Sequence, residues 1–355
     1  MKKTIFIAIM LFGFLRVWAY QWKDSNGVTW LFTLSGSNAT IVGTDFTNGN
    51  ITIPSTVYNN STAYTVTSIG DGVFLECTGL TKVTIPDGII NIGKRSFMNC
   101  SNLKSINIPS SVESIGASAF FGCFGLTKVI VPDISAWCNI HFDFDDDYNN
   151  SDYDDYPDEN NAKFFASPLY YAHYLYSDEN TEIIDLIIPE NVSLVNWGTF
   201  YGCSELKSVT VSEGITDIAW YSFANCSSLT NIILPSSITF IDDGAFQYCS
   251  NVKTVKVYKE TPISIMSDTF SNYESAKLYV PEGCKAAYES AEFWQDFSEI
   301  IEMNSLDIPR TISTDGSNVQ KSENGTWYTL DGRLLGGKPT QKGIYILDGK
   351  KRMEK

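Results

Sequence analysis

Histidine and positive charge are scarce in this sequence. Only two of the 355 residues are histidine, and 25 lysines and arginines stand against 41 aspartates and glutamates. Nucleic acids and anionic membrane surfaces are bound through extended basic stripes. The formal net charge of −16 argues against such a stripe. We therefore predict that neither nucleic acid nor an anionic membrane surface is a partner.

The sequence motifs of catalysis are also missing. We find no Gly-x-Ser-x-Gly turn, no His-Glu-x-x-His pair and no phosphate-binding glycine loop. There is no Cys-x-x-Cys pair to hold a metal ion. Catalysis needs an acid, base or nucleophile with a partner within hydrogen-bond reach, and no such set stands out. We predict a non-enzymatic protein without a cofactor.

Long apolar runs are absent beyond the N-terminus. Lys2 and Lys3 precede an apolar run over residues 5–15, and Val17-Trp18-Ala19 has the small residues of a signal-peptidase site. The run is much shorter than the roughly 20 residues that span a bilayer. Residues 1–19 are therefore predicted to be a signal peptide. The protein is expected to be exported, either secreted or on the bacterial outer surface, with no membrane insertion of the mature chain.

What the sequence does contain is an internal repeat of 23 residues. The pattern apolar-x-x-apolar-x-apolar-Pro reads Leu80, Val83, Ile85, Pro86 in its first clear copy. Later copies reach the proline position at 109, 132, 189, 212, 235, 258 and 281. Six phenylalanines, each three residues before a cysteine, keep the same phase: Phe74, Phe97, Phe120, Phe200, Phe223 and Phe246.

A 23-residue unit cannot bury its own apolar face, but stacked units lay like side chains over like and share one core. The repeat therefore predicts a β-rich solenoid of short parallel strands and turns, with a parallel strand in each coil. Strands of neighbouring coils stack about 4.8 Å apart, so roughly nine of them would give a slab of about 40 Å.

The unit at residues 108–132 resembles the repeat of BspA-type leucine-rich-repeat surface proteins. The likeness lies in the period, in the Ile-Gly and Ala-Phe pairs and in the Phe-x-x-Cys-x-x-Leu core. It extends over roughly residues 51–300. The resemblance implies a right-handed superhelical solenoid, exported to the surface of anaerobic bacteria. It also implies adhesion to host proteins or to other cells.

Eight cysteines in an exported chain first indicate disulfides. Six of them, however, occupy one position in successive coils, between the phenylalanine and leucine positions of the core. Side chains in register along a parallel stack point the same way, which suits a disulfide poorly. We predict that these six are inward-facing thiols that donate to a turn carbonyl. Cys138 and Cys284 lie outside this series.

An insert breaks the register between Pro132 and Pro189, where the spacing is 57 residues. We describe residues 133–188 as an expanded coil, of a kind found in many BspA-type proteins. His141 and His173 both fall within it. Because no fixed ligand spacing surrounds them, we interpret both histidines as structural.

The expanded coil contains nine acidic residues in the segment 143–160. Asp143, Asp145 and Asp147 alternate as hard oxygen ligands of calcium would, but the glycine and the closing glutamate of an EF-hand are missing. A solvated, self-repelling acidic loop is the interpretation we prefer. Calcium binding by these three aspartates is the alternative.

The two ends of the repeat array carry different patterns. Residues 20–50 carry Trp22, Trp30, Phe32 and Phe46 among Gly, Asn and Thr, which is typical of a small β cap over the first coil. The solenoid is assigned to residues 51–303. Within it, residues 282–303 switch to helical spacing and are predicted to form a helical end cap.

Beyond the solenoid we predict a polar linker over residues 304–325 and a β module over residues 326–355. The module reads as two hairpins around the turns Asp331-Gly332 and Asp348-Gly349. It resembles the C-terminal β module of exported Bacteroidetes-type proteins, including sorting domains of type IX secretion. A sorting signal and a small domain without address function are both open interpretations.

A solenoid offers a wide, rigid surface, so we predict binding as its function. The candidate binding residues are the aromatic side chains Trp197, Trp220, Tyr221, Tyr201 and Phe121, because adjacent exposed aromatics are typical of interfaces. The contrasting interpretation is that they pack under the expanded coil. The predicted partner is a protein on a host or bacterial surface. The alternatives are a glycan stacked on the same rings, or a purely structural role.

Overall fold

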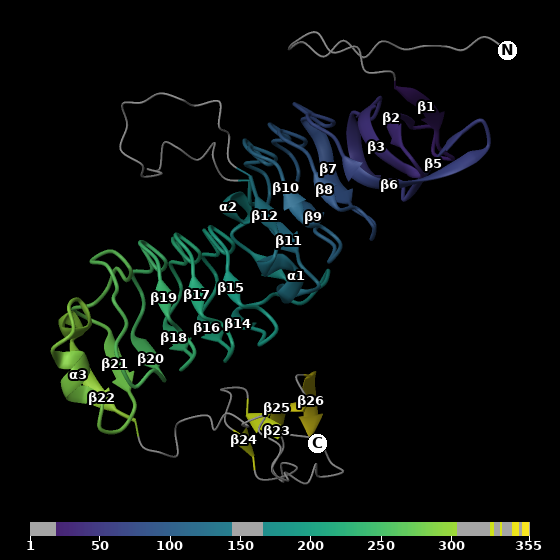
Figure 1. The fold of residues 1–355 in the computed structure, drawn as a ribbon. Helices are drawn as coiled ribbons and strands as arrows, with labels where there is room; N and C mark the ends of the chain where they lie inside the picture. The colour runs from purple at the N-terminus through teal and green to yellow at the C-terminus, as the bar shows by residue number, and fades with distance from the viewer. Residues whose placement is uncertain are drawn as a thin grey trace, which may run out of the picture.

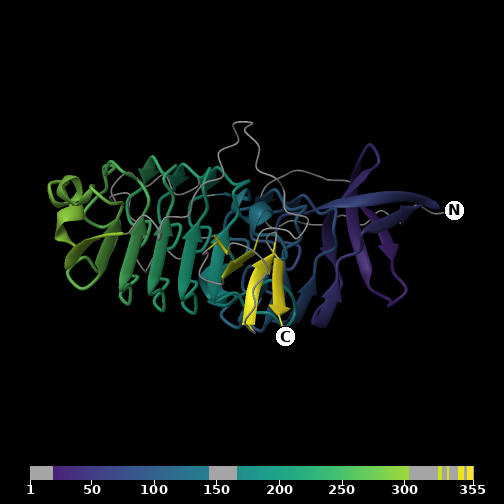
Figure 2. The same cartoon turned by 90° about the horizontal axis from the view of Figure 1, so that it is seen from below.

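The computed structural model describes residues 19–143 and 166–303 in full, and the backbone of four short strands between residues 327 and 354. The predicted signal peptide up to residue 18 and the predicted linker 304–325 lie outside the described residues. The chain winds into an elongated β-solenoid of about 11 turns (Figure 1). Figure 2 shows the same stack of coils seen from below.

Two parallel sheets run along one side of the stacked coils. The first comprises β4 (Asn48–Thr52), β7 (Gly79–Thr84), β9 (Ser105–Asn107), β11 (Lys128–Ile130) and β13 (Leu175–Tyr176). The second comprises β14 (Asp185–Ile188), β16 (Ser208–Val211), β18 (Asn231–Leu234), β20 (Thr254–Val257), β21 (Lys277–Val280) and β22 (Glu299–Glu302). The strands pair in the orders β13-β11-β9-β7-β4 and β14-β16-β18-β20-β21-β22.

Further strands line another side of the coils. They are β6 (Thr62–Ile69), β8 (Asn91–Ile92), β10 (Ser114–Ile115), β12 (His141–Phe142), β15 (Leu194–Val195), β17 (Asp217–Ile218) and β19 (Phe240–Ile241). Partners in the second block lie one repeat apart, as Val195 does beside Ile218 and Ile218 beside Ile241. The 23-residue period therefore sets the register of the stack.

The N-terminal end of the stack is closed by antiparallel strands. They are β1 (Tyr20–Lys23), β2 (Thr29–Ser35), β3 (Asn38–Thr44) and β5 (Thr56–Asn59). β3 joins the solenoid by pairing in parallel with β6. The rings of Trp30 and Phe74, the first phenylalanine of the repeat, pack in a T-shaped arrangement with centroids 6.4 Å apart. This contact covers a core that would otherwise end in water.

The other end is closed by α3 (Lys285–Glu289), the 3₁₀ turn η2 (Trp294–Asp296) and β22. The helical spacing expected over 282–303 therefore holds only in part, because its last residues pair with β21 as a strand. Ile300 is buried while Glu299 is exposed, which is the alternation of a strand.

The two sheets together hold eleven strands, more than the roughly nine expected. β4 begins the first sheet, β22 ends the second, and β13 comes from inside the expanded coil. The insert therefore contributes a strand of its own to the stack. Two helices also belong to the expanded coil: α1 (Ile134–Cys138) and α2 (Leu169–Ala172).

Like side chains stack on like throughout the core. Rings in one block are Phe74, Phe97 and Phe120, and in the other Phe200, Phe223, Phe246 and Phe270. Neighbouring centroids within a block are 5.2 to 5.3 Å apart, and the ring planes differ by 2° to 7°. Each fully buried phenylalanine contributes roughly 1.5–3 kcal/mol of hydrophobic stabilisation.

The repeated cysteines point into this core, as predicted. The thiols of Cys100 and Cys123 donate to the carbonyl oxygens of Phe74 and Phe97, each at a sulfur–oxygen distance of 3.1 Å. The next block repeats the contact, and the thiol of Cys249 donates to the carbonyl of Phe223. Burial raises the pKa of the Cys123 thiol to about 12, which keeps it neutral and unreactive.

The C-terminal strands are β23 (Trp327–Thr329), β24 (Leu334–Leu335), β25 (Gly343–Leu347) and β26 (Lys350–Glu354). β23 pairs antiparallel with β24, and β25 with β26. These are the two pairings expected from the Asp-Gly turns. β23 also pairs with β25, which joins the two hairpins into one sheet of four strands.

Candidate binding surface

A continuous row of aromatic rings follows one flank of the solenoid. We call it the aromatic track. Its members, in the order of their contacts, are Phe124, Tyr171, Tyr170, Tyr201, Tyr221, Trp220 and Trp197. Successive ring centroids are 4.4 to 6.3 Å apart. Aromatic pairs at such distances attract one another beyond their burial, so the track is a rigid surface.

The repeat itself builds one end of the track. Trp197 and Trp220 are 23 residues apart and so occupy the same position in neighbouring coils. Parallel stacking then brings one indole over the other, with centroids 5.9 Å apart and planes inclined by 29°. Both side chains are half-buried. The two tryptophans are therefore neighbours on this flank, and their role in binding stays a prediction.

Tyr221 was predicted to be an exposed binding residue, but only 5% of it is exposed. Its backbone is left-handed, with a φ of 52°. The adjacent coils have a glycine with positive φ at this position, Gly198 and Gly244. A Cβ atom on Gly244 would lie 2.8 Å from the ring of Tyr221. The ring is buried because the next coil leaves it a space without a side chain, so Tyr221 supports the track from beneath.

The expanded coil supplies the middle of the track. Tyr170 and Tyr171 lie on α2, and the ring of Tyr170 stacks on that of Tyr201 with centroids 5.3 Å apart. Packing of Tyr201 against the expanded coil is what the contrasting interpretation expected. The amide of Asn225 donates to the hydroxyl of Tyr201. Tyr171 is itself buried, with only 9% of it exposed, and this burial raises its pKa to about 12.

Phe124 is the most exposed member of the track, with 77% of it accessible. The repeat frame did not single it out. Its only sequence signal is that an aromatic stands one residue after Cys123, where other coils have Ser or Thr. Phe121, which was predicted, is half-buried against the core. Among the described residues no ring contact joins Phe121 to the track.

The histidines and aspartates of the expanded coil are only partly within the described residues. His173 has its Nδ1 atom 2.9 Å from the carbonyl oxygen of Gly202, a structural contact. His141 lies with its Nε2 atom 3.2 Å from a carboxylate oxygen of Asp143. Asp145 and Asp147 lie outside the described residues. Within residues 19–143 and 166–303 no group of three His, Cys, Asp or Glu side chains is placed to hold a metal ion.

The expanded coil also forms a hairpin over the outer face of the first sheet. The hairpin, residues 176–182, closes on a bridge between Tyr176 and Glu182. Its tip places a carboxylate oxygen of Glu179 2.5 Å from the Nζ atom of Lys82. The backbone carbonyl of Glu179 accepts from Lys128 at 2.7 Å, and the Nζ atom of Lys128 lies 4.3 Å from the ring centre of Tyr176. This part of the outer face is therefore occupied by the chain itself.

The stacked coils define a leucine-rich-repeat solenoid. The sequence model described as BspA type leucine-rich repeat region matches six copies, over residues 50–142 and 173–296. Because the match covers more than half of the chain, the protein belongs to the BspA-type leucine-rich-repeat family. Leucine-rich repeat proteins are in general not enzymes.

Solved structures with a similar chain path come from several bacteria. A leucine-rich cell surface protein of Faecalibacterium prausnitzii is 21% identical over 81% of this chain and 95% of its own, with a TM-score of 0.33. A leucine-rich repeat protein of Bacteroides ovatus is 21% identical over 78% and 75%, with a TM-score of 0.38. The pneumococcal vaccine antigen PcpA is 18% identical over 80% and 99%, with a TM-score of 0.27.

No curated protein matches the chain. Among the residues that the structure describes, no helix combines the length and the apolar character needed to cross a bilayer.

Proposed function

We propose that this protein is an exported, non-catalytic binding protein that holds a protein partner of a host or bacterial surface on its aromatic track. The observation that carries the proposal is the continuity of the track. Seven rings from four successive coils touch in series, and Phe124 at one end is 77% exposed. The family, with its surface proteins, supports the same general role.

The physical argument concerns the cost of binding. Aromatic side chains bury a large area at an interface, but ordering a free side chain costs about 0.5–1.5 kcal/mol. In the track, each ring is already held by its neighbours, so its side chain loses little conformational freedom when a partner binds. Tyr201 is fixed by the ring of Tyr170 and by the amide of Asn225. Rigid aromatic anchors of this kind dominate the affinity of protein interfaces.

The same contacts favour a protein over a neutral sugar as the ligand of the track. A sugar ring stacks on a free aromatic face. One face of Trp220 is directed at Trp197, and the ring of Tyr201 is stacked on Tyr170. Phe124 keeps an exposed ring, but the other six rings are half-buried or buried, which suits interdigitating side chains of a protein.

The test compares two phenylalanines that are both exposed. The chain from residue 20 onward is screened against purified matrix proteins, bacterial surface proteins and a glycan array, and Kd is measured for the protein that binds. We expect Phe124→Ala and the double variant Trp197→Ala/Trp220→Ala each to weaken binding at least about tenfold, or 1.4 kcal/mol. Phe240→Ala, which removes a 47% exposed ring outside the track, is expected to leave Kd unchanged.

Undiminished binding by the tryptophan double variant would rule out the track as the binding surface. Equal losses in Phe124→Ala and Phe240→Ala would also contradict it, because they would reflect a general loss of exposed apolar area. Circular dichroism of each variant establishes that the solenoid is intact.

A further inference from the structure

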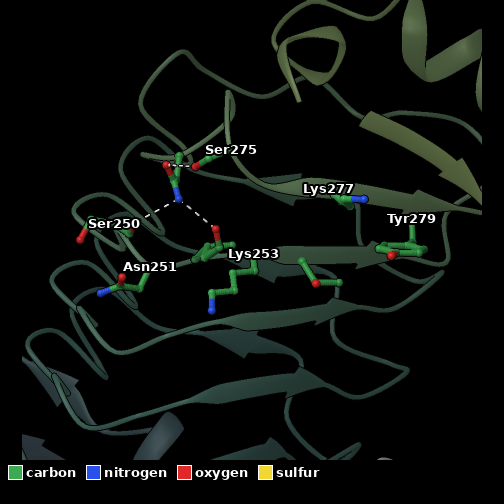
Figure 3. A pocket seen from close by; sticks show the side chains of 9 residues that line it. Ser250, Asn251, Lys253, Ser275, Lys277 and Tyr279 are labelled. Atoms are coloured by element: carbon green, nitrogen blue, oxygen red, sulfur yellow. Dashed lines mark hydrogen bonds between the residues drawn. The ribbon is translucent and has the colours of Figure 1, made fainter. Parts of the chain in front are cut away.

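The second sheet carries a groove on its outer face, and no residue of its lining belongs to the aromatic track. It has a volume of about 670 Å³ and lies where β20 and β21 begin, between the loops 250–253 and 272–275 (Figure 3). Lys253, Lys277 and Tyr279 are among the side chains that line it. The pairing of β20 with β21 sets Thr254 beside Lys277, and Lys256 beside Tyr279.

This groove is cationic, in a chain whose net charge is −16. Lys253 and Lys256 form no ion pair within the described residues. Lys277 pairs with Glu299 at 2.8 Å, but both side chains are about half exposed. An exposed pair of this kind contributes little, so its lysine is free to exchange the carboxylate for that of a ligand. Lys253, which has no ion pair, and the weakly paired Lys277 therefore line the groove. Lys256 stands beside them, with its Nζ atom 5.9 Å from the ring centre of Tyr279.

The loops that border the groove are held in place from within. The side-chain amide of Asn272 donates to the carbonyl oxygens of Ser250 and Val252, at 3.0 and 2.9 Å. Its amide oxygen accepts from the hydroxyl of Ser275. These contacts, drawn as dashed lines in Figure 3, lock one loop onto the other. Asn272 is thus fully used for structure. Lys253, Lys277, Thr254 and the part of the Tyr279 ring that Lys256 does not cover remain to meet a ligand.

On the outer face of the first sheet, two lysines already have partners within the chain. There, Lys82 takes the carboxylate of Glu179, and Lys128 takes a backbone carbonyl and lies over the ring of Tyr176. All three groups come from the hairpin of the expanded coil. No described segment lies in the same way over Lys253 and Lys277, where the groove is open. The outer face of the second sheet therefore presents lysines like those that the hairpin binds on the first sheet, but leaves them open to a ligand.

We propose that this groove binds an anionic polysaccharide, with a carboxylate or sulfate group on Lys253 and Lys277 and a sugar ring against Tyr279. Three features select this class. The cations demand an anionic ligand, the hydroxyl of Thr254 offers hydrogen bonds to a polyol, and the half-exposed tyrosine ring offers a stacking surface. A protein partner is disfavoured, because the apolar lining besides the tyrosine is the buried Val252.

The test uses four soluble polymers with the chain from residue 20 onward. They are a polygalacturonate oligosaccharide, a heparin-derived oligosaccharide, a neutral dextran of similar length and a polyglutamate peptide of similar charge. Kd is measured by calorimetry at about 0.05 M and about 0.5 M salt, where screening lengths differ severalfold. We expect one or both anionic sugars to bind, more weakly at high salt, and dextran not to bind. The stronger of the two identifies carboxylate or sulfate as the preferred group.

Charge reversal at two exposed lysines provides the matched control. Lys253→Glu is expected to weaken the binding of the anionic sugar at least tenfold, and Lys94→Glu, on a turn away from this sheet, is expected to have no effect. Tyr279→Ala should weaken the binding of the anionic sugar but not any binding of polyglutamate. The proposal is overturned if neither anionic sugar binds, if both lysine variants weaken binding equally, or if polyglutamate binds as tightly as the sugars. Phe124→Ala leaves this groove intact, so it should not change the binding of the anionic sugar. The two sites can therefore fail or hold independently of each other.

Discussion

The Nζ atom of Lys82 and a carboxylate oxygen of Glu179 lie 2.5 Å apart, although 97 residues separate them in the chain. The contact fastens the hairpin 176–182 across the outer face of the first sheet. It divides an otherwise uniform solenoid into a block whose outer face is covered and a block whose outer face is open. The expanded coil is therefore a structural divider as well as an insert.

The first prediction concerns the strength of that contact. Both side chains are substantially exposed, at 36% and 57%, so a double-mutant cycle with Lys82→Met and Glu179→Gln should give a coupling of about 0.2–1 kcal/mol. The coupling should become clearly smaller at about 1 M salt, where the screening length falls to about 3 Å. Urea unfolding measures the cycle. A coupling that persists at high salt would mean that the pair is held by something other than charge.

The second prediction concerns the phenylalanine stack. Phe223 is fully buried between Phe200 and Phe246, with centroid distances of 5.2 Å on both sides. Phe223→Ala should therefore lower the free energy of unfolding by about 3–5 kcal/mol, because it leaves a cavity that stacked coils cannot close. Phe124→Ala, at 77% exposure, should change it by less than about 0.5 kcal/mol. Similar losses for the two variants would contradict the core position of Phe223.

The third prediction isolates the space under Tyr221. Gly244→Ala and Gly283→Ala both place an alanine where φ is positive, at +59° and +80°. The left-handed backbone alone costs roughly 1–2 kcal/mol. Only at Gly244 does the new Cβ atom meet a ring, 2.8 Å away, so that variant should lose about 1–3 kcal/mol more. Thermal unfolding compares the two, and equal losses would show that the ring moves aside freely.

The fourth prediction concerns the thiols. Burial raises the pKa of both Cys123 and Cys138 from an ordinary 9.0 to about 12. A thiol reagent at pH 8 should therefore modify the half-buried Cys77 and Cys284 first in the folded protein, and leave the other six cysteines unmodified. Mass spectrometry of the labelled peptides gives the order, and early labelling of Cys123 would contradict it.

The same shifts predict alkaline destabilisation. Above pH 9 the unfolded chain releases its thiol protons while folded Cys123 and Cys138 retain theirs up to about pH 12. The unfolded state then binds fewer protons than the folded state, so stability falls as pH rises through this window. Cys123→Ala should reduce that slope. Urea unfolding at a series of pH values measures it, and a slope unchanged by the substitution would rule out this thiol as a source.

The sequence was sufficient for the stack and for its core. A strict 23-residue period leaves one physical solution, in which equal positions lie over each other, so the phenylalanine ladder, the inward cysteines and the pairing of Trp197 with Trp220 follow from register alone. The period also shows where the stack is interrupted, between Pro132 and Pro189. It does not show how an insert folds, because residues outside the repeat have no equivalent in the next coil.

Only the tertiary structure decided what lies over the repeat frame. The strand β13, the hairpin bound to Lys82 and the tyrosines of α2 all come from the expanded coil, and their partners are distant in sequence. The burial of Tyr221 depends on a glycine in the neighbouring coil, and the lysine groove depends on which part of the outer face the chain leaves open. Register fixes the inside of a solenoid because each coil repeats it. The outer surface is specified by contacts that occur once.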